Sequence, residues 1–156
     1  MRNLRIEELF AGAWVQQFKI EPGAVTLPMC VFGVWKNGRL WLDRDDKEPF
    51  DTVIDKVYPI PVDSRMLEGF GFVKAKGDNV WLKCAGDMRL TVALRMRGGV
   101  EIPRRCAITG KIACWHEEIR YFHELQRWWN DRVFFPFGIS LDLKWHGFKE
   151  KKEELV

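Results

Sequence analysis

The dipeptide Asn37-Gly38 constrains the fold of this chain more than any other feature of the sequence, because it separates two short apolar runs. Both residue types tolerate positive φ, so Asn-Gly in this setting is a strong short-range signal for a β-hairpin. The runs on either side therefore predict two antiparallel strands joined by a two-residue loop. In that register Trp35 faces Leu40, and Val34 faces Trp41.

Further strands are predicted by alternation along the middle of the chain. The longest candidate, 89–97, places apolar side chains at every second position, which is typical of a sheet with one buried face. Asp63 predicts the N-cap of a short helix, Ser64 to Glu68. The alternating residues expected on the buried face of the long strand are Leu90, Val92, Leu94 and Met96.

One longer helix is expected at 121–132, where an apolar stripe recurs at helical spacing, and Pro136 is expected to stop it. A final strand is expected at 139–145. The stripe consists of Tyr121, Leu125, Trp128 and Trp129.

These elements predict an α+β protein dominated by antiparallel β-structure. Residues 1–62 are expected to form a small barrel-like sheet, similar to a Src-homology-3-like barrel, and the prolines at 59 and 61 end its last strand. Residues 63–145 are expected to form a second sheet packed by the C-terminal helix, and 146–156 a charged tail.

Length and composition indicate how the chain folds and in which cellular compartment it is expected. Its 156 residues are enough to fold without a metal or a disulfide, since a chain of this length buries roughly 68–70% of its unfolded surface. No apolar run is long enough to span a membrane, and the charged N-terminus does not resemble a secretory signal. We therefore expect a cytoplasmic protein without membrane association, whose four cysteines are reduced thiols. These are Cys30, Cys84, Cys106 and Cys114.

Positive charge is concentrated in 61–111, which holds 10 basic and 5 acidic residues. An anionic partner should therefore meet this part of the chain. On the predicted long strand Arg89, Arg95 and Arg97 share one face, and an aromatic residue on the neighbouring strand could stack on bases. The alternative is a solvated outer face. The candidate nucleic-acid-binding residues are Arg89, Arg95, Arg97, Arg104, Arg105 and Trp81.

Two other groups of residues invite a chemical interpretation. His123, at the start of the longer helix, is a candidate general base or partner contact, or else a structural residue that fixes the helix to a sheet. Cys106, Cys114, His116 and Glu117 suggest zinc, but the expected hairpin pairs Cys106 with Ala113, which puts the two thiols on opposite faces. We therefore expect no metal and no cofactor.

Three segments taken in order resemble an uncharacterised protein family common in gut Bacteroidetes and in their phages and mobile elements. The resemblance spans residues 4 to 143 and departs from the family pattern at 127–129, where Arg-Trp-Trp replaces Asn followed by Leu-Tyr. The resemblance implies an origin in such bacteria or in their mobile elements, but it implies no biochemical activity. The matching residues are Leu4-Arg5-Ile6 with Gly12-Ala13-Trp14-Val15, Pro59-Ile60-Pro61-Val62 with Leu67 and Gly71-Phe72, and Tyr121-Phe122-His123-Glu124-Leu125-Gln126.

No catalytic motif is present: there is no phosphate-binding glycine loop, and the adjacent Glu117 and Glu118 would point to opposite faces of a strand. We therefore expect a non-enzymatic binding or adaptor module with a protein partner, encoded by a phage or mobile element. The alternative is a nucleic-acid-binding module that uses the basic residues of 81–111.

Overall fold

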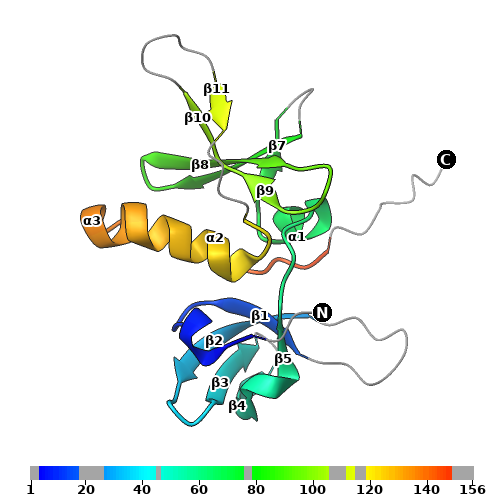
Figure 1. Ribbon diagram of the computed structural model, residues 1–156, viewed down its shortest axis with the longest axis vertical. Helices are drawn as coiled ribbons and strands as arrows, with labels where there is room; N and C mark the ends of the chain where they lie inside the picture. The colour runs from blue at the N-terminus through cyan, green and yellow to red at the C-terminus, as the bar shows by residue number, and fades with distance from the viewer. Residues whose placement is uncertain are drawn as a thin grey trace, which may run out of the picture. The chain divides into compact units, whose positions relative to one another are not determined.

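The computed structural model describes residues 4–17, 27–44, 47–75, 79–105, 112–114 and 119–148. It confirms an α+β protein built mostly from antiparallel strands (Figure 1). The chain forms two compact units, residues 1–60 with 121–128 and residues 61–120 with 129–156. The longer helix therefore begins in the first unit, whereas the sequence grouped all of it with the second sheet.

The first unit contains a five-stranded antiparallel sheet in the order β4-β3-β2-β1-β5. Its edge strands β4 and β5 are not paired with each other in the part of the chain described, so the sheet is open rather than a closed barrel. Its core is formed by apolar side chains such as Val15, Val31 and Leu40. Its elements are η1 (Ile6–Glu8), β1 (Trp14–Gln17), β2 (Pro28–Val34), β3 (Arg39–Arg44), β4 (Lys47–Val53), η2 (Ile54–Lys56) and β5 (Val57–Pro59).

The second unit contains a four-stranded antiparallel sheet in the order β6-β7-β8-β9, together with a separate two-stranded hairpin. The predicted N-cap is confirmed, because the Asp63 side chain accepts a hydrogen bond of 2.9 Å from the Met66 N–H at the start of α1. The elements are α1 (Ser64–Gly69), β6 (Val73–Lys74), β7 (Val80–Ala85), β8 (Met88–Leu94), β9 (Val100–Glu101), β10 (Pro103–Arg105) and β11 (Ile112–Cys114).

The longer helix extends further than the sequence predicts. The expectation that Pro136 stops it is wrong: Pro136 lies in the first turn of the last segment, where a missing N–H is tolerated. The helix ends instead at Gly138, whose φ of 74° is left-handed. Its consecutive segments are α2 (Phe122–Trp129), a π-helical turn η3 (Asn130–Phe134) and α3 (Phe135–Phe137).

The buried side of this helix also differs from the predicted stripe. Leu125 and Trp129 are buried as expected, and Phe122 is buried beside them, but Tyr121 and Trp128 are only half-buried. The buried positions follow the spacing i, i+3, i+7, which is a normal helical face. The apolar stripe is therefore shifted around the helix axis by about one residue relative to the prediction.

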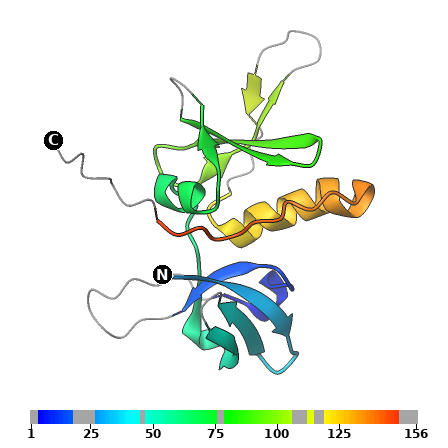
Figure 2. The same ribbon diagram turned by 180° about the vertical axis from the view of Figure 1, so that it is seen from behind.

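The expected strand at 139–145 is absent from the described chain, and 138–148 has no regular secondary structure. Side-chain and backbone contacts fix this segment instead. The Trp129 indole Nε1–H donates to the Ile139 carbonyl at 2.9 Å, and the His146 N–H donates to the Gly69 carbonyl at 2.8 Å. Figure 2 shows the segment running back from the end of α3.

Candidate functional site

The structure separates the predicted basic residues. Strand β8 ends at Leu94 and is followed by a turn, in which the Arg95 N–H donates to the Gly99 carbonyl and the Gly98 N–H donates to the Arg95 carbonyl. Gly99 has a positive φ of 76°, which lets the chain turn earlier than the alternation implied. Arg97 therefore does not share a strand face with Arg89, and the expectation that Met96 is buried is wrong, since it is fully exposed.

Trp81 is not available for stacking. It pairs with Val92 across β7 and β8, and opposite residues of an antiparallel pair share a face. That face is buried, and the Trp81 side chain is only 7% exposed. Arg89 pairs with Cys84 and lies on the opposite, exposed face.

Among the remaining basic residues, the one with a described side chain, Arg95, does not extend the patch. The Arg95 guanidinium contacts the Glu101 carboxylate, with 3.5 Å between Nε and Oε1, so its charge is locally neutralised. Arg104 and Arg105 lie on β10, but their side chains are outside the described part of the structure. The described side chains therefore do not form the single basic and aromatic surface that the sequence suggested.

His123 is buried, with 2% of its surface exposed, and its ring stacks on Tyr121 at a centroid distance of 5.9 Å. A partner or substrate could not reach the ring without the helix moving. This burial favours the structural interpretation, in which His123 helps to pack the start of α2.

The zinc hypothesis falls mostly outside the described residues, since Cys106, His116 and Glu117 are not described. The β10–β11 register differs from the expected one, because Ala113 pairs with Arg104 instead of Cys106. In the described segments there is no group of three His, Cys, Asp or Glu residues that could hold a metal. Neither Cys30 nor Cys84 takes part in a disulfide bond.

The first unit contains an exposed aromatic surface that sequence reasoning missed. Trp35 is 45% exposed, Trp41 is 38% exposed and Phe32 is 67% exposed. The rings of Trp35 and Trp41 have centroids 6.0 Å apart and planes inclined at 49°. We call these three side chains the aromatic face.

The aromatic face arises from a hairpin register one residue away from the prediction. Val34 pairs with Leu40, and the Trp35 N–H donates to the Arg39 carbonyl, so the loop contains three residues rather than two. Gly38 takes a φ of 81° at the end of that loop, as a three-residue hairpin requires. A one-residue shift moves side chains to the other face of the sheet. It therefore places Trp35 on the same face as Trp41.

A β-bulge completes this surface. The register shifts between Val31 and Gly33, so Phe32 is the extra residue of β2, and Gly33 pairs with Trp41. A Cβ on Gly33 would lie 3.5 Å from two atoms of the Trp35 ring. The Trp35 indole therefore lies over the bare backbone of Gly33, beside Trp41.

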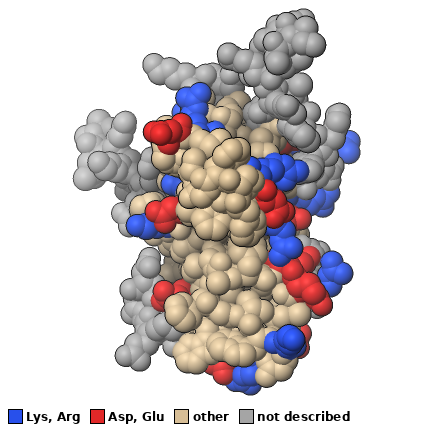
Figure 3. All heavy atoms as spheres, turned by 90° about the vertical axis from the view of Figure 1, so that its left-hand side faces the viewer, with Lys and Arg blue, Asp and Glu red and all other residues tan. Residues whose placement is uncertain are grey.

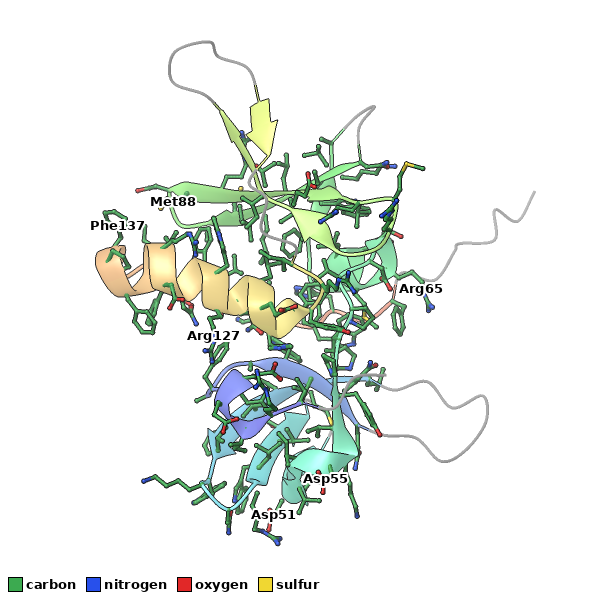
Figure 4. All side chains as sticks on the ribbon, viewed as in Figure 1. Asp51, Asp55, Arg65, Met88, Arg127 and Phe137 are labelled. Atoms are coloured by element: carbon green, nitrogen blue, oxygen red, sulfur yellow. The ribbon has the colours of Figure 1, made fainter. Side chains whose placement is uncertain are left out.

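Charged groups border the aromatic face on β3 and β4. The Arg39 guanidinium forms an ion pair with Asp51, which pairs with Trp41 across the two strands (Figure 4). The hydrogen bond to Asp51, together with its negative charge, raises the pKa of Arg39 above its ordinary value. Asp43, two residues after Trp41 on β3, is also exposed. The surface is therefore an apolar centre with a polar rim, the usual anatomy of a protein interface.

The second unit has its own exposed aromatic residues at the end of the longer helix. Phe135 and Phe137 are exposed and Phe134 is partly exposed, and Figure 4 shows Phe137 at this end. Figure 3, which views this end of the helix, shows a surface there with few charged side chains.

No protein-family model, no curated protein and no solved structure matches the chain. In the described segments, no helix is both long enough and apolar enough to cross a bilayer.

Proposed function

We propose that this chain is a non-enzymatic binding module that engages a protein partner through the aromatic face of its first unit. The observation that carries the proposal is the Trp35–Trp41 pair, two large rings in contact with each other and exposed on a sheet whose opposite face forms the core. Trp is among the residues most enriched at the energetic centres of protein interfaces. Indole and phenyl groups bind partners but supply no acid, base or nucleophile, which supports a binding role.

The surrounding structure favours a preformed surface. Leu40 and Leu42, which alternate with Trp41 on β3, are fully buried and anchor the strand. The Arg39–Asp51 ion pair fixes the rim on the neighbouring strand. A rigid surface loses little conformational entropy on binding. The resemblance to a family of Bacteroidetes, their phages and their mobile elements supports a search for the partner among phage or host proteins.

The test begins with capture of partners from a native host lysate and identification by mass spectrometry. Each candidate is then purified and its Kd is measured with the wild-type chain and with a variant that combines Trp35→Ala and Trp41→Ala. We expect the double variant to raise Kd by at least about tenfold, as truncation of central aromatic residues usually does. Phe137→Ala removes an even more exposed ring from the other unit, so it is the matched control and should leave Kd unchanged.

The nucleic-acid alternative is tested on the same proteins. Fluorescence anisotropy with single- and double-stranded DNA and RNA at low salt measures binding that should weaken steeply as salt rises, because phosphate neutralisation releases counterions. Binding of this kind that is reduced by Arg89→Ala and not by the tryptophan changes would contradict the protein-binding proposal. The burial of Trp81 and the pairing of Arg95 with Glu101 favour the protein partner.

A further inference from the structure

Lys83 and His146 converge on Gly71 in the second unit. A Cβ built on Gly71 would lie 3.6 Å from the Lys83 Nζ atom and 3.5 Å from the His146 Nε2 atom. Both nitrogen atoms therefore lie within 3.6 Å of the point where a Cβ would stand, and the His146 Cδ2 atom lies 3.4 Å from the same point. Gly71 has a φ of 85°, a conformation that residues with a Cβ rarely adopt.

Three separate elements hold these groups in place. Gly71 follows α1, and its N–H donates to the Glu68 carbonyl at 3.0 Å. Lys83 lies on β7, two residues from the buried Trp81 and therefore on the same face of the sheet. The backbone of His146 is fixed by its hydrogen bond to the Gly69 carbonyl. The convergence therefore depends on the packing of the unit and not on one flexible loop.

Lys83 and His146 have no oppositely charged side chain bound to them among the described residues. Within the described segments, neither the Lys83 ammonium nor the His146 imidazole has a hydrogen bond or an ion pair, although Lys83 is half-buried. The buried Trp81 Nε1–H, on the same sheet face as Lys83, also has no acceptor there. An anion bound beside these groups would be stabilised by a charge-assisted hydrogen bond from the Lys83 ammonium.

We propose that Gly71, Lys83 and His146 form a binding site for a phosphate monoester group. The Lys83 ammonium supplies a positive charge, and the His146 imidazole supplies a hydrogen-bond donor. A side chain at position 71 would contact both groups, and glycine places none there. The Lys83 ammonium attracts a monoester dianion more strongly than a singly charged diester. This site is independent of the aromatic face, which lies in the other unit.

The site belongs to the most basic part of the chain. Residues 61–111 carry 10 basic and 5 acidic side chains, and Lys83 is one of the former. A field of this sign raises the local concentration of anions around the second unit. The proposed anion site therefore uses a lysine of this basic segment. It does not use the arginines that the sequence analysis proposed.

The experiment uses NMR of the full chain, with the imidazole signals of its three histidines resolved. Inorganic phosphate is titrated against sodium chloride at equal ionic strength. We expect a saturable shift of the His146 signals with phosphate and no shift of the buried His123 signals. Equal responses to phosphate and chloride, or no saturable response at His146, would overturn the site.

Variants test the residue assignment. Lys83→Gln should weaken phosphate binding by roughly tenfold or more, as loss of a hydrogen bond from a charged group does, and Lys83→Arg should retain most of it. Lys56→Gln, an exposed lysine of the first unit, is the matched control and should change nothing. The amide spectrum of each variant verifies folding. Unchanged affinity in folded Lys83→Gln would contradict the proposal.

A final comparison identifies the source of the phosphate. Phosphoserine carries a monoester, and a dinucleotide carries a diester. Tighter binding of phosphoserine supports the proposal, whereas tighter binding of the dinucleotide would overturn the monoester assignment in favour of nucleic acid. Neither result depends on Trp35 or Trp41. The test of this site and the test of the proposed protein-binding function are therefore independent of each other.

Discussion

The side chain of Gln126 completes the hydrogen bonding of the backbone beside Trp14. Its Oε1 atom accepts the Trp14 N–H at 2.9 Å, and its Nε2 atom donates to the Gly12 carbonyl at 2.7 Å. Gln126 is almost fully buried. A residue of α2 thus binds backbone more than a hundred positions earlier in the chain, and its amide matches the first N–H of β1 and a carbonyl just before that strand.

Replacing Gln126 by Ala is expected to lower the free energy of unfolding by about 2–5 kcal/mol, because it removes two hydrogen bonds and leaves a backbone donor and acceptor unsatisfied. Urea denaturation followed by circular dichroism measures the loss. Asp131→Ala, an exposed change on the same helix, is the control and should stay within about 0.5 kcal/mol. If both variants lost a similar free energy of unfolding, the two hydrogen bonds of Gln126 would not contribute specifically to stability.

Leu125→Ala is expected to cost about 2–5 kcal/mol, because Leu125 is fully buried and its truncation leaves a cavity. Arg127 is exposed, but its guanidinium donates to the Glu7 carbonyl at 3.1 Å and lies 5.5 Å from the centre of the Phe10 ring (Figure 4). Arg127→Ala is therefore expected to cost about 0.5–1 kcal/mol. Thermal and urea unfolding of the two variants should show this order, and the reverse order would mean that the helix face is misassigned.

Gly33→Val is expected to displace the Trp35 ring, since a branched side chain would occupy the space over which the indole lies. Gly33→Ala places its Cβ at ordinary contact distance, 3.5 Å, and should be tolerated. Near-ultraviolet circular dichroism reports the coupling of the two neighbouring indoles. We expect this signal to fall in the valine variant and persist in the alanine variant. A partner that binds the aromatic face should lose affinity in the same order.

Gly69→Ala is expected to loosen the segment at 138–148, because a Cβ on Gly69 would overlap the Trp145 ring. That ring packs edge-on against Phe70, with centroids 5.0 Å apart. Overpacking of this kind costs about 1–3 kcal/mol. Hydrogen exchange should increase in the segment. Trp145→Ala removes the clash, so adding Gly69→Ala to it should cost much less than Gly69→Ala alone, and additive losses would exclude the clash as the cause.

Several elements could be predicted because their causes are local. The Asp63 cap depends on one side chain and the amide three residues later, and both lie in the same short segment. The hairpin around Asn37-Gly38 depends on turn residues that tolerate positive φ. The candidate site could not be predicted in the same way. Trp35 lies on the same face as Trp41 only if the loop contains three residues rather than two. Asn37-Gly38 is compatible with either loop length, so the sequence does not decide between them.

The sequence by itself determined the class of fold, the existence of the main hairpin and the break after Pro59, because these follow from periodicity and backbone preference within a few residues. Only the tertiary structure decided which side chains are exposed. Alternation assigns residues to two faces but does not say which face is covered, so Trp81 became buried and Trp41 remained accessible. Lys83 and His146 both lie near Gly71 because segments distant in the sequence pack together. No local sequence pattern predicts such packing.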